Sequence, residues 1–484
     1  MRGVRLIVVS SAAALAAALG FSPVGATTPA GPLYAIKGAR IHTATGAPIA
    51  GGTIVMRNGV IEDVGANVTA PADAIVIDGS NMNVYPGLID MDNDAPIDSG
   101  DAPAAAAGGA GGRGGGGATT FATLEEAERA KHAVIMRPHF LAAGNLRAGT
   151  PELQQLASAG VTTVLAAPST GIFKGQSALV NVAIPPDDPQ ISTIADYRNG
   201  LAVVKSPVAM HVNMAGRGGG QGYPGALLGT IAFTKQGFLD AQWQRDAEAQ
   251  YQRTGAKGPR PIVEPALDAL KPALAKQMPV AFDVNEAREI DRALAMAAEF
   301  GLDPIVVGAG SAGERRAELA AAKARVILSI NFPGAGGGGA GGGGGAGGGG
   351  GRGGGAGQSL RQMKAAADAP KVPAQLAQSG VGFAFSSGGA TAANFVRNAG
   401  RVVKEGGLAA DAVLRALTLG SAQLAGAADR VGSLEKGKIA NVIVVDGDLF
   451  DGGRVRHVFI DGRPVEVTEA ATQANTGRGR GGNR

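Results

Sequence analysis

Three carboxylates lie close together in the stretch from Val84 to Asp98, which reads VYPGLIDMDNDAPID. In an extended strand, side chains alternate between two faces, so Asp90, Asp92 and Asp94 point the same way, about 6 Å apart. At that separation two like charges repel by roughly 3 kcal/mol if the effective dielectric constant is near 20. The stretch therefore predicts that these carboxylates bind a cation, pair with a basic side chain or share a proton.

The other residue types limit what such a cation can be. The sequence has no cysteine, which excludes a thiolate zinc site, a thiol nucleophile and disulfides. A zinc hydrolase needs two or three nitrogen or sulfur ligands beside an open position, whereas carboxylates suit hard cations such as Mg, Mn or Ca. The serines in Gly175–Ser177 and at Ser386 and Ser387 lack the pattern of a nucleophile elbow. The chain has only five histidines: His42, His132, His139, His211 and His457.

Short strands are predicted near both ends of the chain. Between Leu33 and Ile77 the pattern is strand-like, with a hairpin turning at Arg57-Asn58-Gly59. Two further stretches, Gly432–Asp448 and Arg456–Val467, repeat this order of strand, turn and strand.

Between these ends, strands alternate with helices. Pro279–Val284 is a buried-strand run, Asn285 can cap the following helix, and Gly301 ends that helix. The same alternation predicts a helix face formed by Ile290, Ala293, Leu294 and Ala297, a strand at Ile305–Val307, a helix around Glu314–Lys323 and a strand at Arg325–Ile330. Strand and helix at this spacing indicate parallel βαβ units and hence an α/β fold.

Several stretches resemble the amidohydrolase superfamily. PGLID at Pro86–Asp90 is similar to the segment that enters the barrel of these enzymes, where His-x-His usually follows, and DRVGSLEKGK at Asp429–Lys438 matches nearly letter for letter. Three more stretches, Ser158–Val182, Tyr223–Gln242 and Ala412–Gly426, resemble an exported, imidazolonepropionase-like branch. The resemblance covers most of Leu33–Val467 and implies a (β/α)8 TIM-like barrel with a β-sandwich side domain built from both chain ends.

The resemblance and the composition together divide the chain into segments. Glycine makes up 79 of 484 residues, so part of the length is low-complexity sequence that cannot offset its ordering entropy by burial. The expected order is a signal peptide (1–26), the N-terminal half of the sandwich (27–84), the barrel (85–430) with glycine-rich inserts near 102–118 and 334–357, the C-terminal half of the sandwich (431–468) and a disordered Arg/Gly tail (469–484).

The resemblance also implies where metal ligands would lie. The family uses one or two metal ions to activate water and polarise a carbonyl. At its ligand positions this chain has Asp92 and Asp94 after strand one, Asp283 at strand five, Gly308 near strand six and Gly388 at strand eight. None of the expected histidines is present, so Asp92, Asp94 and Asp283 are the candidate metal ligands. No catalytic residue is assigned. His211 lies near the position of the family's strand-four lysine. Lys174, beside Gly175, could reach the mouth of the barrel, but a solvated loop lysine is the commoner interpretation.

Export is predicted from the first 26 residues. Arg2 and Arg5 precede an apolar run from Leu6 to Phe21, and small residues lead to an expected cleavage after Ala26. The mature protein is expected to be periplasmic or secreted, with no membrane association beyond the signal peptide. The net charge of +4 depends on arginines in glycine-rich segments, which gives no electrostatic argument for nucleic-acid binding. A small-molecule ligand and homo-oligomerisation are both compatible with the sequence.

Three hypotheses for function stay open. The first is the family's inherited reaction, hydrolysis of a non-peptide carbon–nitrogen bond. The second is a pseudoenzyme, in which the barrel persists as a binding or docking module after the loss of its metal ligands. The third is a hydrolase that uses Mg or Mn bound by carboxylate oxygens.

Overall fold

The computed structural model describes residues 33–98, 123–183, 197–215, 224, 226–332 and 360–468. These residues all belong to one compact unit, Gly31–Arg484. The predicted signal peptide, both glycine-rich inserts and the Arg/Gly tail lie outside the described residues.

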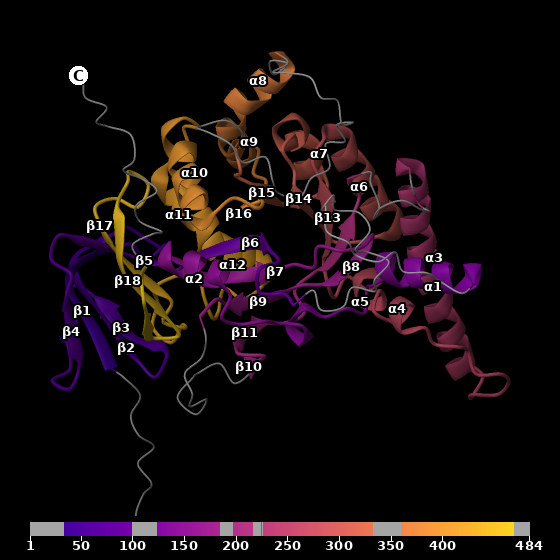
Figure 1. Cartoon of the computed structure of the whole chain (residues 1–484), viewed down its shortest axis with the longest axis horizontal. Helices are drawn as coiled ribbons and strands as arrows, with labels where there is room; N and C mark the ends of the chain where they lie inside the picture. Colours follow the sequence, from indigo (N-terminus) through magenta and orange to yellow (C-terminus); the bar gives the residue numbers. More distant parts are fainter. Residues whose placement is uncertain are drawn as a thin grey trace, which may run out of the picture. The chain divides into compact units, whose positions relative to one another are not determined.

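One sheet contains strands from both ends of the chain (Figure 1). Its order is β19-β18-β17-β5-β1-β2-β3, with β4 also pairing with β1. Antiparallel pairing of β17 with β5 places Val444 opposite Val84. The strands are β1 (Leu33–Ile41), β2 (Ile49–Arg57), β3 (Val60–Gly65), β4 (Ile75–Asp78), β5 (Met82–Pro86), β17 (Val442–Asp446), β18 (Arg454–Ile460) and β19 (Arg463–Val465).

The hairpin between β2 and β3 turns where the sequence predicts it. Asn58 and Gly59 both have positive φ, 52° and 81°, which is the backbone of a type I′ turn. Arg57 pairs with Val60 across the turn. The residue preferences of this turn type thus fix the register of the two strands.

Two further sheets carry the candidate site. The five-stranded sheet has the order β10-β11-β9-β7-β6, and the six-stranded sheet has the order β16-β15-β14-β13-β12-β8. From β12 to β16 all neighbours are parallel, as the alternation of strands and helices predicts. The strands are β6 (Leu88–Asn93), β7 (Val161–Ala166), β8 (Phe173–Gln176), β9 (Ala178–Asn181), β10 (Tyr197–Arg198), β11 (Leu201–Lys205), β12 (Met210–Asn213), β13 (Val280–Val284), β14 (Pro304–Gly308), β15 (Arg325–Ser329) and β16 (Phe383–Ser386).

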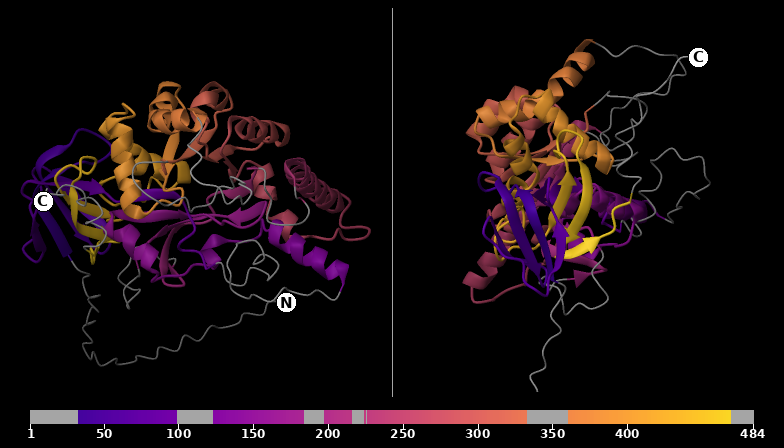
Figure 2. Two further views of the ribbon diagram at one scale, coloured as in Figure 1. Left: turned by 45° about the horizontal axis from the view of Figure 1, so that its top comes forward. Right: turned by 90° about the vertical axis from the view of Figure 1, so that its left-hand side faces the viewer.

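Helices connect and cover these strands. In Figure 1, α6, α7, α9 and α10 lie together on one side of β13–β16, and Figure 2 shows the same layering from another direction. The α-helices are α1 (Leu124–Ile135), α2 (Pro151–Ser158), α3 (Leu227–Arg253), α4 (Pro265–Asp268), α5 (Lys271–Leu274), α6 (Ala287–Phe300), α7 (Arg316–Ala321), α8 (Leu360–Asp368), α9 (Val372–Gln378), α10 (Ala392–Lys404), α11 (Ala410–Leu417) and α12 (Leu419–Ala425). The 3-10 helices are η2 (Ala142–Gly144), η4 (Ala312–Arg315) and η5 (Ala369–Lys371). In the described part of the chain, no helix is both long and apolar enough to span a membrane.

Helix α6 has the predicted buried face and the predicted end, but a different start. Gly301 ends it with a left-handed φ of 65°. The N-cap is Glu286, and the prediction of Asn285 is wrong. Glu286 and Glu289 form a reciprocal capping box, in which the Glu289 carboxylate accepts hydrogen bonds from the backbone N–H groups of Asn285 and Glu286.

The helix predicted around Glu314–Lys323 is shorter and divided. A 3-10 turn, η4, precedes α7, which ends at Ala321. A tighter first turn of this kind is common at helix starts, and periodicity alone does not distinguish it from an α-helical turn.

An apolar layer lies between the five-stranded sheet and the six-stranded sheet, which we call the two inner sheets. It consists of alternate residues of successive strands, all less than a tenth exposed: Ile89, Met91, Leu165, Leu179, Ala202, Val204, Ala209, Ala281, Ile305, Val307, Ile327 and Ala384. Because strand side chains alternate, residues two positions further along these strands face the same interior. The layer therefore identifies which side chains point into the space at the carboxyl ends of the strands.

Candidate functional site

Polar residues follow the apolar layer along three strands of the six-stranded sheet, β12, β13 and β16. His211 lies two positions after Ala209, Asp283 two after Ala281, and Ser386 two after Ala384. Strand alternation therefore directs all three into the same interior. His211 and Ser386 are fully buried, and Asp283 is partly exposed.

Lys174 supplies the positive charge of this site. Its ammonium forms an ion pair with the Asp283 carboxylate, and both side chains are largely buried. Lys174 lies in β8, which pairs with β12, so its interpretation as a solvated loop lysine is wrong. The Gly175–Ser177 stretch likewise consists of the last two residues of β8 and Ser177, the single residue that separates β8 from β9. Burial is the largest influence and acts to lower the pKa of Lys174, but the carboxylates of Asp283 and Asp92 outweigh it, so the pKa is raised.

Asp90 is held by hydrogen bonds instead of by a charge. It is fully buried, and its two oxygens accept from the Ser387 backbone N–H at 2.8 Å and from Asn93 Nδ2 at 2.9 Å. Burial is the main influence on Asp90 and raises its pKa, and these donors act in the opposite direction. The Ser387 bond also ties β6 to the end of β16.

Asp92 carries the unbalanced charge of the site. Burial, followed by the neighbouring Asp283 carboxylate, raises the pKa of Asp92 to about 7, although Lys174 acts to lower it. Asp94 contributes to this repulsion but is itself exposed, because β6 ends at Asn93 and the chain then turns. The strict alternation predicted for Asp90, Asp92 and Asp94 therefore fails at the third residue.

His211 is isolated from hydrogen-bonding partners. Both of its ring nitrogens are buried, and neither forms a hydrogen bond. Burial and the charge of Lys174 lower the pKa of His211 to about 3, so the ring is neutral. The remaining histidines lie elsewhere: His42 follows β1, His132 is on α1, His139 is exposed in a turn, and His457 is on β18.

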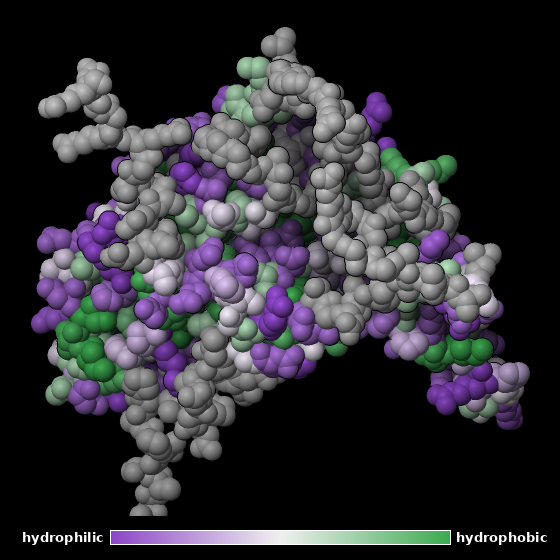
Figure 3. All heavy atoms as spheres, in the orientation of Figure 1, coloured by the Kyte–Doolittle hydropathy of each residue, from purple (hydrophilic) through white to green (hydrophobic). Residues whose placement is uncertain are grey.

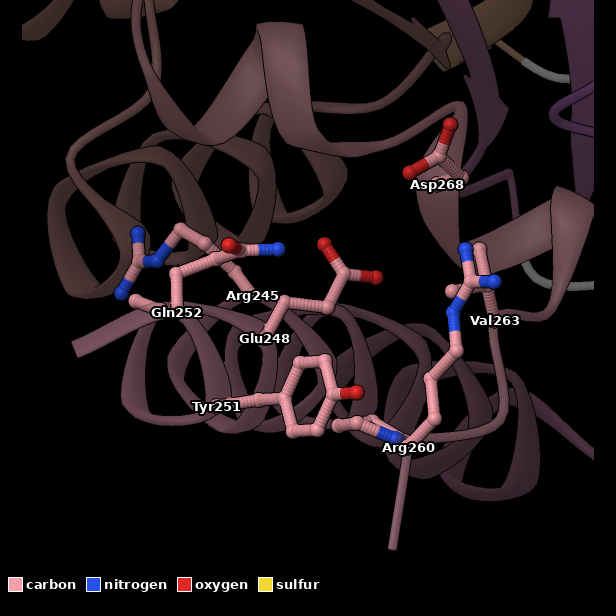
Figure 4. Close-up of a pocket in the computed structure, with 9 residues that line it drawn as sticks. Arg245, Glu248, Tyr251, Gln252, Arg260, Val263 and Asp268 are labelled. Carbon is pink, nitrogen blue, oxygen red and sulfur yellow. The ribbon is translucent and has the colours of Figure 1, made fainter. Parts of the chain in front are cut away.

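A separate cavity of about 490 Å³ lies at the C-terminal end of α3 and contains none of these residues. In Figure 4, the Glu248 carboxylate and the Gln252 amide point toward its centre, with Tyr251 and Arg260 beside them. Glu248 and Asp268 are both paired with Lys271. This cavity is therefore distinct from the site formed by Asp90, Asp92, Lys174 and Asp283, which we call the carboxylate site.

Comparisons with known proteins agree with this architecture. Residues 359–465 match the model of the Amidohydrolase family. The structure is similar to that of an amidohydrolase from Thermotoga maritima MSB8, with a TM-score of 0.67 and 20% identity over 90% of this chain and 99% of that one. Residues 359–465 thus match this family, and the structural similarity at 20% identity shows a shared fold. No curated protein matches it. A prolidase complexed with N-methylphosphonate-L-proline is more distant, with a TM-score of 0.49 and 15% identity over 90% of this chain and 99% of that one.

Two of the positions that the sequence resemblance assigns to metal ligands are glycines whose backbone is left-handed. Gly388, at the strand-eight position, has a φ of 55°, and a Cβ there would lie 1.9 Å from Ser329 Oγ. Gly308, near the strand-six position, has a φ of 86°, and a Cβ would lie 2.8 Å from the Val284 carbonyl oxygen. Both side chains would need a strained backbone as well as displaced neighbours. Aspartate or histidine at these positions therefore does not fit the present local structure.

The donor set does not fit the transition metal that the superfamily implies. In the part of the chain that the structure describes, no group of three or more His, Asp, Glu or Cys side chains is arranged to hold a metal ion. The Lys174 ammonium pairs with Asp283, one of the three candidate ligands, and interacts electrostatically with the other two, Asp92 and Asp94. Metal ligation by Asp92, Asp94 and Asp283 thus stays a prediction, and it would require displacement of the lysine.

Sequence reasoning missed Lys174 as the partner of the carboxylates. The only available signal was that Lys174 lies within a stretch resembling a family segment, while Asp283 is 109 positions away. The Ser387 backbone N–H was missed as well, because almost every residue has such a donor and the residue type does not indicate which one binds Asp90.

Proposed function

We propose that this chain is a degenerate amidohydrolase in which the Lys174 ammonium has taken the place of the catalytic cation. On this proposal the protein binds a small molecule and does not hydrolyse carbon–nitrogen bonds by the family's metal-dependent route. The supporting observation is the contact of Lys174 with Asp283 and its charge interaction with Asp92. These two residues stand at the family's ligand positions of strands five and one.

A closed (β/α)8 barrel is the arrangement we propose for the two inner sheets. The Asp90–Ser387 hydrogen bond joins the edge strand β6 of one sheet to the end of β16, the edge strand of the other. On the opposite side, β8 and β9 are separated by one residue along the chain and belong to different sheets. Active sites of such barrels lie at the carboxyl ends of the strands, where the lysine and carboxylates are found.

The second candidate is a hydrolase that uses an oxygen-ligated Mg or Mn ion. The observation that favours it is the excess of carboxylates: Asp283, Asp90 and Asp94 all raise the pKa of Asp92, against one ammonium. A divalent cation would relieve this repulsion, provided that Lys174 moved away. The two candidates therefore differ in whether the lysine or a metal ion neutralises the cluster.

Divalent-cation titration of thermal unfolding distinguishes them. We expect the unfolding temperature of the wild-type protein to be unaffected by Mg, Mn, Ca or Zn, because Lys174 already provides the charge. The Lys174→Met variant should be destabilised and should become sensitive to divalent cations. Lys436→Met, which removes an exposed lysine, is the matched control. Saturable stabilisation of the wild type by Mg or Mn would favour the second candidate, and Zn-dependent hydrolysis would contradict both.

Export by way of residues 1–26 remains part of the proposal. The support is the sequence of basic residues, apolar run and small residues in that segment. N-terminal sequencing of the protein from its own cells should begin at Thr27. A mature protein that still contains the apolar run would contradict a cleaved signal peptide.

A further inference from the structure

The cavity at the C-terminal end of α3 lies where the chain turns back alongside its own helix. After Arg253, Gly255 and Gly258 have φ values of 69° and 104°, a left-handed backbone that glycine adopts without strain. The returning segment is held by the buried side chain of Gln244, whose Oε1 accepts a hydrogen bond from the Glu264 backbone N–H at 2.9 Å. The volume of about 490 Å³ is within the range of about 300 to 1,000 Å³ that is typical of small-molecule sites.

One side of this cavity has an excess of negative charge. Glu248 and Asp268 both line it, and both pair with the single ammonium of Lys271, which leaves one negative charge over. Glu248 Oε2 binds Lys271, whereas Glu248 Oε1 is buried and accepts no hydrogen bond from any described residue. The Nε2 of Gln244, one turn earlier on the same side of α3, is also buried without a described partner. Because buried polar atoms are unfavourable without partners, a ligand with a hydrogen-bond donor is expected at Glu248 Oε1.

The other side of the cavity has a guanidinium group without a partner. Arg260 lines the cavity and forms no ion pair or side-chain hydrogen bond in the part of the chain that the structure describes. Figure 4 shows the Arg260 guanidinium and the Glu248 carboxylate on opposite sides of the cavity. The second guanidinium of the lining, that of Arg245, already pairs with Asp246 at 3.0 Å. The cavity therefore separates one uncompensated negative charge from one positive charge, which suits a ligand that carries both.

The lining is also partly apolar. It includes Ala249, Pro261, Val263 and the ring of Tyr251. Val263 is 43% exposed, and Figure 3 shows hydrophobic side chains next to hydrophilic ones over this end of α3. An apolar ligand body with charged groups at its ends fits such a lining.

We propose that this cavity binds a zwitterionic amino compound, either a free amino acid or a short peptide, with an apolar side chain. The ammonium of the ligand donates to Glu248 Oε1, and its carboxylate accepts from the Arg260 guanidinium. A purely anionic ligand would be repelled on the Glu248 side, and a purely cationic one on the Arg260 side. The cavity contains no residue of the carboxylate site, so this inference goes beyond the proposed function and does not depend on it.

Isothermal titration calorimetry of the full-length protein with L-leucine and with glycyl-L-leucine tests the proposal. We expect at least one of these probes to bind with a Kd below about 1 mM, and the tighter of the two indicates whether the ligand is an amino acid or a peptide. The N-acetylated form of each probe lacks the ammonium, and its amide lacks the carboxylate. Both blocked forms should bind at least about tenfold more weakly than the parent probe.

Substitutions show whether the probe binds in this cavity. Arg260→Met and Glu248→Gln each remove one of the two charges and should weaken binding at least about tenfold. Lys257→Met is the matched control, because it removes an exposed cation of the same loop that does not line the cavity, and it should leave the affinity unchanged. Circular dichroism checks that each variant is folded.

The proposal is overturned if neither probe binds, or if the blocked forms bind as tightly as the parent probes. It is equally overturned if a folded Arg260→Met or Glu248→Gln variant keeps the wild-type affinity, because the probe would then bind elsewhere.

Discussion

We expect the Asp92 carboxylate to make a contribution to stability that becomes less favourable as the pH rises. Its pKa is about 7 in the folded chain, compared with 3.8 for an unperturbed aspartate. Between these two values the native state holds a proton that unfolding releases, so stability falls with increasing pH. The difference between these two pKa values corresponds to an upper limit of about 4 kcal/mol.

Asp92→Asn removes this titration and keeps the shape of the side chain. We expect the variant to equal the wild type near pH 4, where Asp92 is protonated. At pH 8 it should be more stable, by up to about 4 kcal/mol. The measurement is urea unfolding of both proteins at several pH values, with stability compared at each pH so that other titrating groups cancel. Asp94→Asn is the matched control, because Asp94 is exposed and its substitution should change stability by less than about 0.5 kcal/mol. A loss of stability in Asp92→Asn at pH 8 would instead show that the Asp92 carboxylate is a required partner of Lys174.

Three further outcomes follow from the structure. Lys174→Met should lower the free energy of unfolding by about 3 to 5 kcal/mol at pH 8, because it leaves buried carboxylates without their cation. In the double variant with Asp283→Asn, denaturant unfolding should show that much of this loss is recovered. Gly388→Asp should be destabilised by at least about 1 kcal/mol in the same assay, because the new side chain needs a left-handed backbone and the space that Ser329 occupies. A variant as stable as the wild type would contradict this steric explanation. Glu289→Ala should cost about 1 kcal/mol of thermal stability by removing the capping box of α6, whereas Glu299→Ala near the helix end should cost less.

The sequence predicted correctly those elements that are determined by residues close together in the chain. The Asn58-Gly59 turn has residues suited to positive φ, and the buried face and the end of α6 follow from periodicity and Gly301. The N-cap was assigned one residue too early because Asn285 suits a cap by type, whereas the Glu286 and Glu289 pair decides it by reciprocal hydrogen bonds.

The electrostatics of the site could not be predicted in the same way. Three carboxylates near Asp90 predict that some positive charge is required, but not which one. Lys174 lies in a four-residue strand next to Gly175, where a loop is the usual interpretation, and its partner Asp283 comes from a strand far along the chain. The requirement for glycine at position 388 likewise depends on Ser329, which only the packing of β15 beside β16 brings close.

On this proposal a lysine, and not a metal ion, neutralises the carboxylates at the positions that the resemblance assigns to metal ligands. Metal analysis of the mature protein, purified without chelators from cells grown with Zn, Mn and Mg, tests this most directly. We expect far less than one equivalent of any of these metals per chain. One equivalent of bound metal in the wild type, lost on replacement of Asp92 and Asp283 by asparagine, would contradict it.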